Sequence, residues 1–290
     1  MSMSLFSFGM FGFFACSENE IIKRPFDEIA VVDGDFDHFG EILTRMDIAH
    51  ESYDGFISQA VYNPEEDGSL NGYKVENLFT DIDEGNRTIM LDYDAIFLNS
   101  GVRGLGSYVY NGVENDDMFL LDDVALEHVR AFVQAGRTLV VSDWAGDLIE
   151  QVWPDKITFV NEENCSNEDC FDIAQVGSNE KIIATIENDN LMSQLEVDSI
   201  QLRFDYSYWT AMKEVSDDVD VFLRGDITYR SSEGDGYFDM TNVPLLVGFN
   251  DGSGYVLFSS FHYRAQNTNV VDTTLLTIIE GLNPGSAYEQ

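Results

Sequence analysis

The sequence predicts an α/β protein built on a mostly parallel sheet that helices cover on both faces. Short, nearly continuous apolar runs alternate along the chain with stretches of helical spacing. Such apolar runs are typical of strands that are buried on both sides. Hydrophobic residues make up 44% and aromatic residues 13% of the 290 residues, which is enough to build a core.

The expected elements of the first half are, in order, a strand at 28–33, a helix at 39–46, strands at 48–53 and 93–98, a helix at 122–134 and a strand at 138–141. The longer helix is the clearest of them. Leu126, Val129 and Phe132 lie on one face of it, and Gly136 provides the glycine stop that is typical beyond a helix C-terminus.

The pattern changes between about 151 and 240. Segments of alternating polarity, such as 198–209, predict a β-rich insertion within a single domain at 26–290. The chain then returns to the main pattern. Its last expected elements are a strand at 244–249, a turn at 250–254, a strand at 254–262 and a helix at 271–282.

The charge of the chain argues against nucleic acid as a partner. The 15 Lys and Arg residues face 53 Asp and Glu residues, which gives a formal net charge of −38. A protein of this charge repels a polyanion instead of displacing its counterions. An acidic, lysine-poor surface suits a salty medium, where screening relaxes its self-repulsion.

The N-terminus predicts export and a lipid anchor. An apolar run at 5–15 is too short to span a bilayer, and Cys16 follows it directly. Residues 1–16 therefore indicate a signal peptide that ends in a lipobox-like sequence, with 17–25 as a tether. We expect an extracytoplasmic lipoprotein held by Cys16 at the outer membrane or periplasmic face. The departures are a Phe in place of the usual Leu and no basic residue before the apolar run, so a buried N-terminal strand or helix is the alternative.

The other two cysteines predict a disulfide. Cys165 and Cys170 enclose a short acidic loop, and a small disulfide loop fits an oxidising compartment. The rival interpretation is a metal site. Two thiolates without further ligands nearby make a poor zinc set.

Three segments in order, YDAIFLNSG, LEHVRAFVQAGRTLVVSDWAG and VPLLVGFNDGSGYVLFSSFH, carry a family resemblance. In this order and spacing the chain resembles the class I glutamine-amidotransferase-like family. The resemblance implies a flavodoxin-like sheet with a nucleophilic Cys, inside Gly-x-Cys-x-Gly, at a sharp strand-to-helix turn. It also implies a catalytic His in a Phe-His-Pro-Glu motif.

This chain departs from both motifs. Aligned on Gly146, Trp144 falls at the nucleophile position, and Arg264 falls where the family has the Glu that orients the His, while His262 is retained. Base activation of a nucleophile needs the nucleophile, the base and the orienting group together. The resemblance therefore implies a pseudoenzyme, with the fold kept and the amidotransferase chemistry lost.

Ligands of open α/β sheets bind beyond the carboxyl ends of the strands. The candidate binding residues at these ends are Asp33, Asp35, Asn99, Ser100, Asp143, Trp144, His262 and Arg264. Trp144 beside Asp143 suits a sugar or a cation. The alternative is that Trp144 fills the vacated nucleophile site as a core residue.

The favoured interpretation is a non-catalytic envelope lipoprotein that binds a small ligand or an envelope protein and needs no cofactor. The alternative is a hydrolase that uses His262 with Ser100, Ser142 or Asp143. A calcium site at Asp33, Asp35 and Asp37 is a further alternative, because these carboxylates alternate as ligands do in calcium loops. The remaining ligands of such a loop are missing, since His38 and Thr44 stand at the glycine and glutamate positions.

Overall fold

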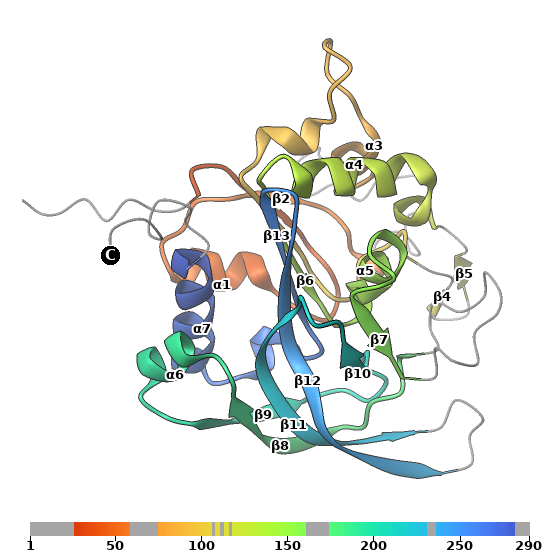
Figure 1. Ribbon diagram of the computed structural model, residues 1–290. Coiled ribbons are helices and arrows are strands. Elements are labelled where there is room, and N and C mark those ends of the chain that lie inside the picture. The colour runs from red at the N-terminus through yellow and green to blue at the C-terminus, as the bar shows by residue number, and fades with distance from the viewer. Residues whose placement is uncertain are drawn as a thin grey trace, which may run out of the picture.

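The computed structural model shows one sheet of nine strands in the order β2-β1-β3-β6-β13-β12-β11-β8-β9 (Figure 1). The residues that the structure describes are 26–58, 75–105, 108–110, 113–115, 118–160, 174–230 and 236–281. The predicted signal peptide, tether and disulfide, with Cys16, Cys165 and Cys170, lie outside these residues. In the described part of the chain, no helix has the length and apolar character needed to cross a membrane.

Five neighbouring strands form the parallel half of the sheet. Their bounds are β1 Ile29–Val32, β2 Glu51–Tyr53, β3 Ala95–Leu98, β6 Thr138–Ser142 and β13 Gly254–Ser259. The pairs β1–β2, β1–β3, β3–β6 and β6–β13 are all parallel. Every residue of β1, β3, β6 and β13 is buried, as their continuous apolar runs predict.

The other half of the sheet is antiparallel, so the sheet is mixed and not mostly parallel. Its strands are β12 Tyr237–Asp251, β11 Asp220–Arg230, β8 Glu180–Ile186 and β9 Ser199–Phe204. Short connections explain two of the antiparallel pairs, β11–β12 and β12–β13, whereas a helix, α6 (Asp189–Leu195), lies between β8 and β9. The two-residue turn between β12 and β13, for example, can join only antiparallel strands. The β-rich segment at 151–240 therefore extends the main sheet.

Two small sheets, six α-helices and short 3-10 helices at Ile89–Asp92, Phe119–Leu121, Asp143–Ala145 and Tyr263–Ala265 complete the described chain. The small sheets pair β7 Ile157–Phe159 with β10 Met212–Val215, and β4 Tyr108–Tyr110 with β5 Val113–Asn115. The helices are α1 Phe39–Arg45, α3 Val75–Thr80, α4 Asp123–Gln134, α5 Gly146–Val152, α6 Asp189–Leu195 and α7 Thr268–Gly281.

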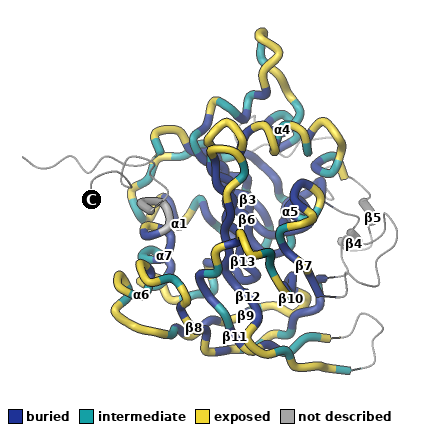
Figure 2. The backbone as a smooth tube through the Cα atoms, in the orientation of Figure 1, coloured by how far each residue is buried: buried dark blue, intermediate teal, exposed yellow. Residues whose placement is uncertain are grey.

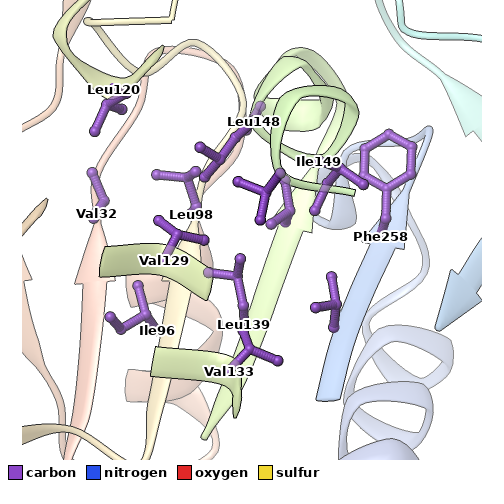
Figure 3. Close-up of a cluster of buried hydrophobic side chains, with 14 of the residues drawn as sticks. Val32, Ile96, Leu98, Leu120, Val129, Val133, Leu139, Leu148, Ile149 and Phe258 are labelled. Atoms are coloured by element: carbon purple, nitrogen blue, oxygen red, sulfur yellow. The ribbon is translucent and has the colours of Figure 1, made fainter. Parts of the chain in front are cut away.

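Alternate side chains of the parallel strands enter two hydrophobic clusters, because successive strand residues point to opposite sides of a sheet. Val31 and Phe97 join a cluster with residues of α1, α6 and α7. Val32, Leu98 and Leu139 join the other, with residues of α3, α4 and α5, as Figure 3 shows for part of it. The central strands are buried along their length in Figure 2.

Candidate functional site

The carboxyl ends of β1, β3, β6 and β13 meet at one edge of the sheet, because these four strands are adjacent and parallel. The loops after β1 and β3 touch closely there. Backbone N–H groups of Asp35 and Phe36 donate to the carbonyls of Gly101 and Ser100, over 3.2 and 3.1 Å. Gly34 is needed at this contact, since a Cβ on it would lie 2.4 Å from the Ser100 carbonyl oxygen.

The turn after β6 has Asp143 at its apex. Asp143 is a non-glycine residue with a φ of +47°, and it follows directly on the last residue of the strand, Ser142. A left-handed backbone here turns the chain sharply into the helices that follow and aims the Asp143 side chain beyond the strand end. The sequence alignment assigned this apex to Trp144. The backbone places Asp143 there, one residue earlier.

His262, three residues beyond the end of β13, lies between two carboxylates. Its Nε2 is 2.8 Å from Oδ2 of Asp143, and its Nδ1 is 2.9 Å from Oδ1 of Asp205. The side chains of His262 and Asp143 are 4% and 2% exposed, so this cluster lies out of bulk water. Because a carboxylate only accepts hydrogen bonds, both ring nitrogens carry protons and the imidazole is a cation.

The surroundings of His262 keep it charged at neutral pH. Burial by itself lowers the pKa of His262, but hydrogen bonds to Asp143 and Asp205, with the charges of Asp143 and Asp37, raise it to about 10. For Asp205 burial acts in the opposite direction and raises the pKa. The hydrogen bond and the charge of His262 outweigh it and hold the pKa of Asp205 below its ordinary value. The cluster is therefore a buried Asp–His⁺–Asp group.

Further hydrogen bonds hold Asp143 and the backbone next to His262. The backbone N–H of Thr210 donates to Oδ1 of Asp143 over 2.7 Å, and the Ser100 hydroxyl donates to its Oδ2 over 3.1 Å. Asp37 is buried and accepts from the backbone N–H groups of Tyr263 and Arg264, over 3.0 and 3.1 Å, which holds the chain just after His262. Burial raises the pKa of Asp37.

A cavity of about 160 Å³ opens above this group. Its lining residues are Phe36, Asp143, Trp144, Tyr206, Ser207, Tyr208 and His262. Trp144 is half-buried in the wall, so it borders the crevice. The rings of Trp144 and Tyr206 stand at 71° and 62° to the ring of Phe36, with centroid separations of 4.8 and 5.8 Å. We call this cavity, with its lining residues, the aromatic pocket.

Of the predicted binding residues, Asp143, Trp144 and His262 line the aromatic pocket, and Ser100 is buried behind it, bonded to Asp143. Arg264 lies beside it, where it donates to the Tyr206 hydroxyl over 2.7 Å and pairs with Asp205 at 3.5 Å. Asn99 and Asp35, from the same set, make structural hydrogen bonds that are described next.

Asn99 and Ser142 have structural partners. Asn99 accepts from the N–H of Phe39 over 2.8 Å and donates to the carbonyl of Val32 over 2.7 Å. The Ser142 hydroxyl accepts from the N–H of Ser100 over 3.0 Å. Both residues therefore tie neighbouring strand ends together.

Asp33, Asp35 and Asp37, the three carboxylates of the calcium hypothesis, do not converge on one site. Asp35 accepts from the N–H and hydroxyl of Ser58, over 3.0 and 2.7 Å, and Asp37 holds backbone N–H groups. Asp33 is partly buried, and this burial raises its pKa to about 6. Among the described residues, no three His, Cys, Asp or Glu side chains form a group that could hold a metal ion.

Sequence reasoning missed Phe36, Asp205, Tyr206 and Tyr208. The last three lie between β9 and β10, in a segment recognised only as β-rich. A signal was present, since the aromatic run Tyr-Ser-Tyr-Trp follows Asp205 directly at the end of a strand. What was missing was the information that this strand end lies beside His262.

The fold and the site together define an α/β protein with a mixed nine-stranded sheet and an aromatic pocket at the carboxyl edge of its parallel strands. No protein-family model and no curated protein match the chain.

Similar solved structures include a proposed GMP synthase component from Thermoplasma acidophilum, with 12% identity, a TM-score of 0.47 and coverage of 90% of this chain and 96% of that one. A proposed ThuA-like protein from Bacteroides uniformis has 10% identity, a TM-score of 0.46 and coverage of 93% and 95%. The N-terminal domain of mmIFT52 has 12% identity, a TM-score of 0.48 and coverage of 91% and 100%.

Proposed function

We propose that this protein is a non-catalytic, lipid-anchored envelope protein that binds a small molecule in the aromatic pocket. One observation carries the binding role. Aromatic rings line a cavity of about 160 Å³ next to the hydrogen-bonded Asp–His⁺–Asp group. A concave apolar site with a few fixed polar groups is the usual form of a small-molecule site. Its volume suits a small ligand or one head group of a larger ligand.

The same group argues against acid–base catalysis. A general base needs a free lone pair, and both ring nitrogens of His262 donate to carboxylates. A general acid works best with a pKa near the working pH, whereas the pKa of His262 is raised to about 10. The Ser100 hydroxyl donates to Asp143 and not to His262, so His262 is not placed to act as its base.

Replacement of Trp144 tests the binding role. We expect that a thermal-shift and tryptophan-fluorescence screen of sugars, amino acids and methylated ammonium compounds finds a ligand for the full chain. Trp144→Ala removes one wall of the pocket and should weaken that ligand at least tenfold, about 1.4 kcal/mol. Tyr237→Ala is the matched control, because Tyr237 is 70% exposed and does not line the pocket. Equal affinity of wild type and Trp144→Ala would contradict the proposal.

The anchor rests on the sequence around Cys16 and has its own test. We expect protein purified from its native membrane, without reduction, to begin at Cys16, to carry a diacyl or triacyl adduct there, and to have Cys165 joined to Cys170. Cys16→Ala should lack the lipid and keep residues 1–15. Intact mass spectrometry with peptide mapping measures all three features. An unmodified Met1 terminus with three free thiols would overturn export and anchoring, but not binding by the pocket.

A further inference from the structure

The ligand class of the aromatic pocket follows from what its walls offer, and this inference rests on the proposed binding role. Phe36 stands at 71° to Trp144 and at 62° to Tyr206, so these rings form a corner and not one flat platform. The Arg264 guanidinium already lies over the Tyr206 ring, 5.4 Å from its centroid. Tyr208 adds a fourth ring. A corner of ring faces suits a compact, rounded group, because each face carries the negative part of the ring quadrupole.

Several polar atoms of the walls are already engaged. The Trp144 indole N–H donates to the Tyr208 carbonyl over 2.6 Å. The Tyr206 and Tyr208 hydroxyls accept from Arg264 and Arg230, over 2.7 and 2.9 Å. Asp143 and His262 bond to each other, as described above. A sugar needs several directional partners for its hydroxyl groups, and each unmatched one costs free energy. The pocket therefore favours a ligand group that makes few hydrogen bonds.

The charge of the whole chain favours a cation, while the charges next to the pocket nearly cancel. The carboxylates next to it are Asp143 and Asp205. His262 and Arg264 are each paired with one of them, and a third cation, Arg230, bonds to the Tyr208 hydroxyl. Asp37 adds a buried acidic group behind His262. The local positive charges are thus balanced, while the whole chain carries a formal charge of −38. Such a field draws cations to the surface and repels anions.

We propose that the aromatic pocket binds a methylated ammonium group, in which a positive charge is spread over methyl groups that make no conventional hydrogen bonds. Ring faces recognise this chemistry through cation–π attraction and apolar contact together. Trp144 is the main contact, because tryptophan is the strongest cation–π partner. Asp143, which also lines the pocket, is a carboxylate held in place by its pairing with His262.

An isosteric pair of probes tests this ligand class on the full chain at constant ionic strength. Choline carries a trimethylammonium group, and 3,3-dimethylbutan-1-ol has the same shape without the charge. We expect choline to bind at least tenfold more tightly than the alcohol, by isothermal titration and by Trp144 fluorescence. Trp144→Ala should lower choline affinity at least tenfold, Trp144→Phe should lower it less, and Tyr237→Ala should leave it unchanged. Ammonium chloride controls for the general attraction of cations to an acidic chain.

The outcomes separate the two proposals. Equal binding of choline and the alcohol, or choline binding that Trp144→Ala leaves unchanged, would overturn the cation site. A different result would be that methyl glucoside binds, that Trp144→Ala abolishes this binding, and that choline does not bind. That result would overturn the ligand class and keep the binding role. If no compound of the broader screen binds in a Trp144-dependent way, the binding role itself fails, and the ligand class fails with it.

Discussion

Replacing His262 by alanine is expected to lower the free energy of unfolding by about 3–5 kcal/mol, the usual cost of removing one partner of a buried ion pair. The side chain of His262 is 4% exposed and bonds to both Asp143 and Asp205. Its loss leaves those two carboxylates without the cation between them. Urea unfolding at neutral pH measures the change. A loss below about 1 kcal/mol would show that the Asp–His⁺–Asp group is not a stabilising unit.

His128 provides the matched control for this variant. It is a half-buried histidine of α4, and its Nδ1 hydrogen-bonds to the carbonyl of Phe79 over 2.8 Å. It has a single neutral partner, so His128→Ala should cost only about 1 kcal/mol. The difference between the two alanine variants then reports the charge cluster and not the loss of an imidazole.

The same histidine predicts how stability depends on pH. The pKa of His262 is raised to about 10 in the folded chain, from an ordinary value of 6.5. The stability that His262 contributes is therefore fully present below pH 6.5 and is lost as the pH rises through about 10. Asp205→Asn removes one of the two carboxylates and should shift this loss to lower pH. His262→Ala should lack this component altogether.

His262→Ala also tests the hydrolase alternative, in which His262 acts with Ser100, Ser142 or Asp143. We expect wild type and variant to behave alike in a screen of chromogenic esters, amides and glycosides. The left-handed backbone at Asp143 is the feature that gives this alternative its interest, since strained residues cluster at active sites. Turnover by wild type that His262→Ala abolishes, with the variant still folded, would overturn the non-catalytic proposal.

Replacing Trp209 by alanine should cost about 3–5 kcal/mol and also abolish ligand binding. Trp209 is 2% exposed, stacks on Phe204 with ring centroids 4.0 Å apart, and donates to the Ser178 carbonyl over 2.8 Å. The segment between the two stacked rings carries Asp205, Tyr206 and Tyr208. Removal of the indole therefore frees one side of the aromatic pocket as well as leaving a cavity.

Trp153→Ala separates the two effects. Trp153 is also buried, packs on Phe249 and donates to Asp251 over 2.7 Å, but it does not line the pocket. We expect a similar loss of stability with unchanged affinity, measured by unfolding and by the titration of whichever ligand the screen identifies. Retained affinity in Trp209→Ala would show that the stacked pair does not position the pocket segment.

Much of the parallel half of the fold could be predicted from the sequence. The apolar runs that became β1, β3, β6 and β13 are local patterns, and a strand buried on both sides shows itself without its neighbours. The helix predicted at 122–134 is α4, at Asp123–Gln134. The polar residues that follow these strands could be assigned to one edge, because parallel neighbours end at the same edge.

The mixed sheet could not be predicted in the same way. The antiparallel strands β8, β9 and β11 come from the segment at 151–240, where polar and apolar residues alternate. This alternation does not indicate which strand each of them pairs with. Alternation is a property of one strand, whereas pairing is a property of two.

The chain's own pattern therefore determined its class, its central strands and the presence of Asp143, Trp144 and His262 at one edge of the sheet. Only the tertiary structure decided that Asp143 and not Trp144 occupies the apex of the turn, since a backbone φ of +47° is set by the packed surroundings. It also decided that Asp205 bonds to His262. These residues are 57 positions apart, and local periodicity carries no information about contacts between segments so distant in sequence.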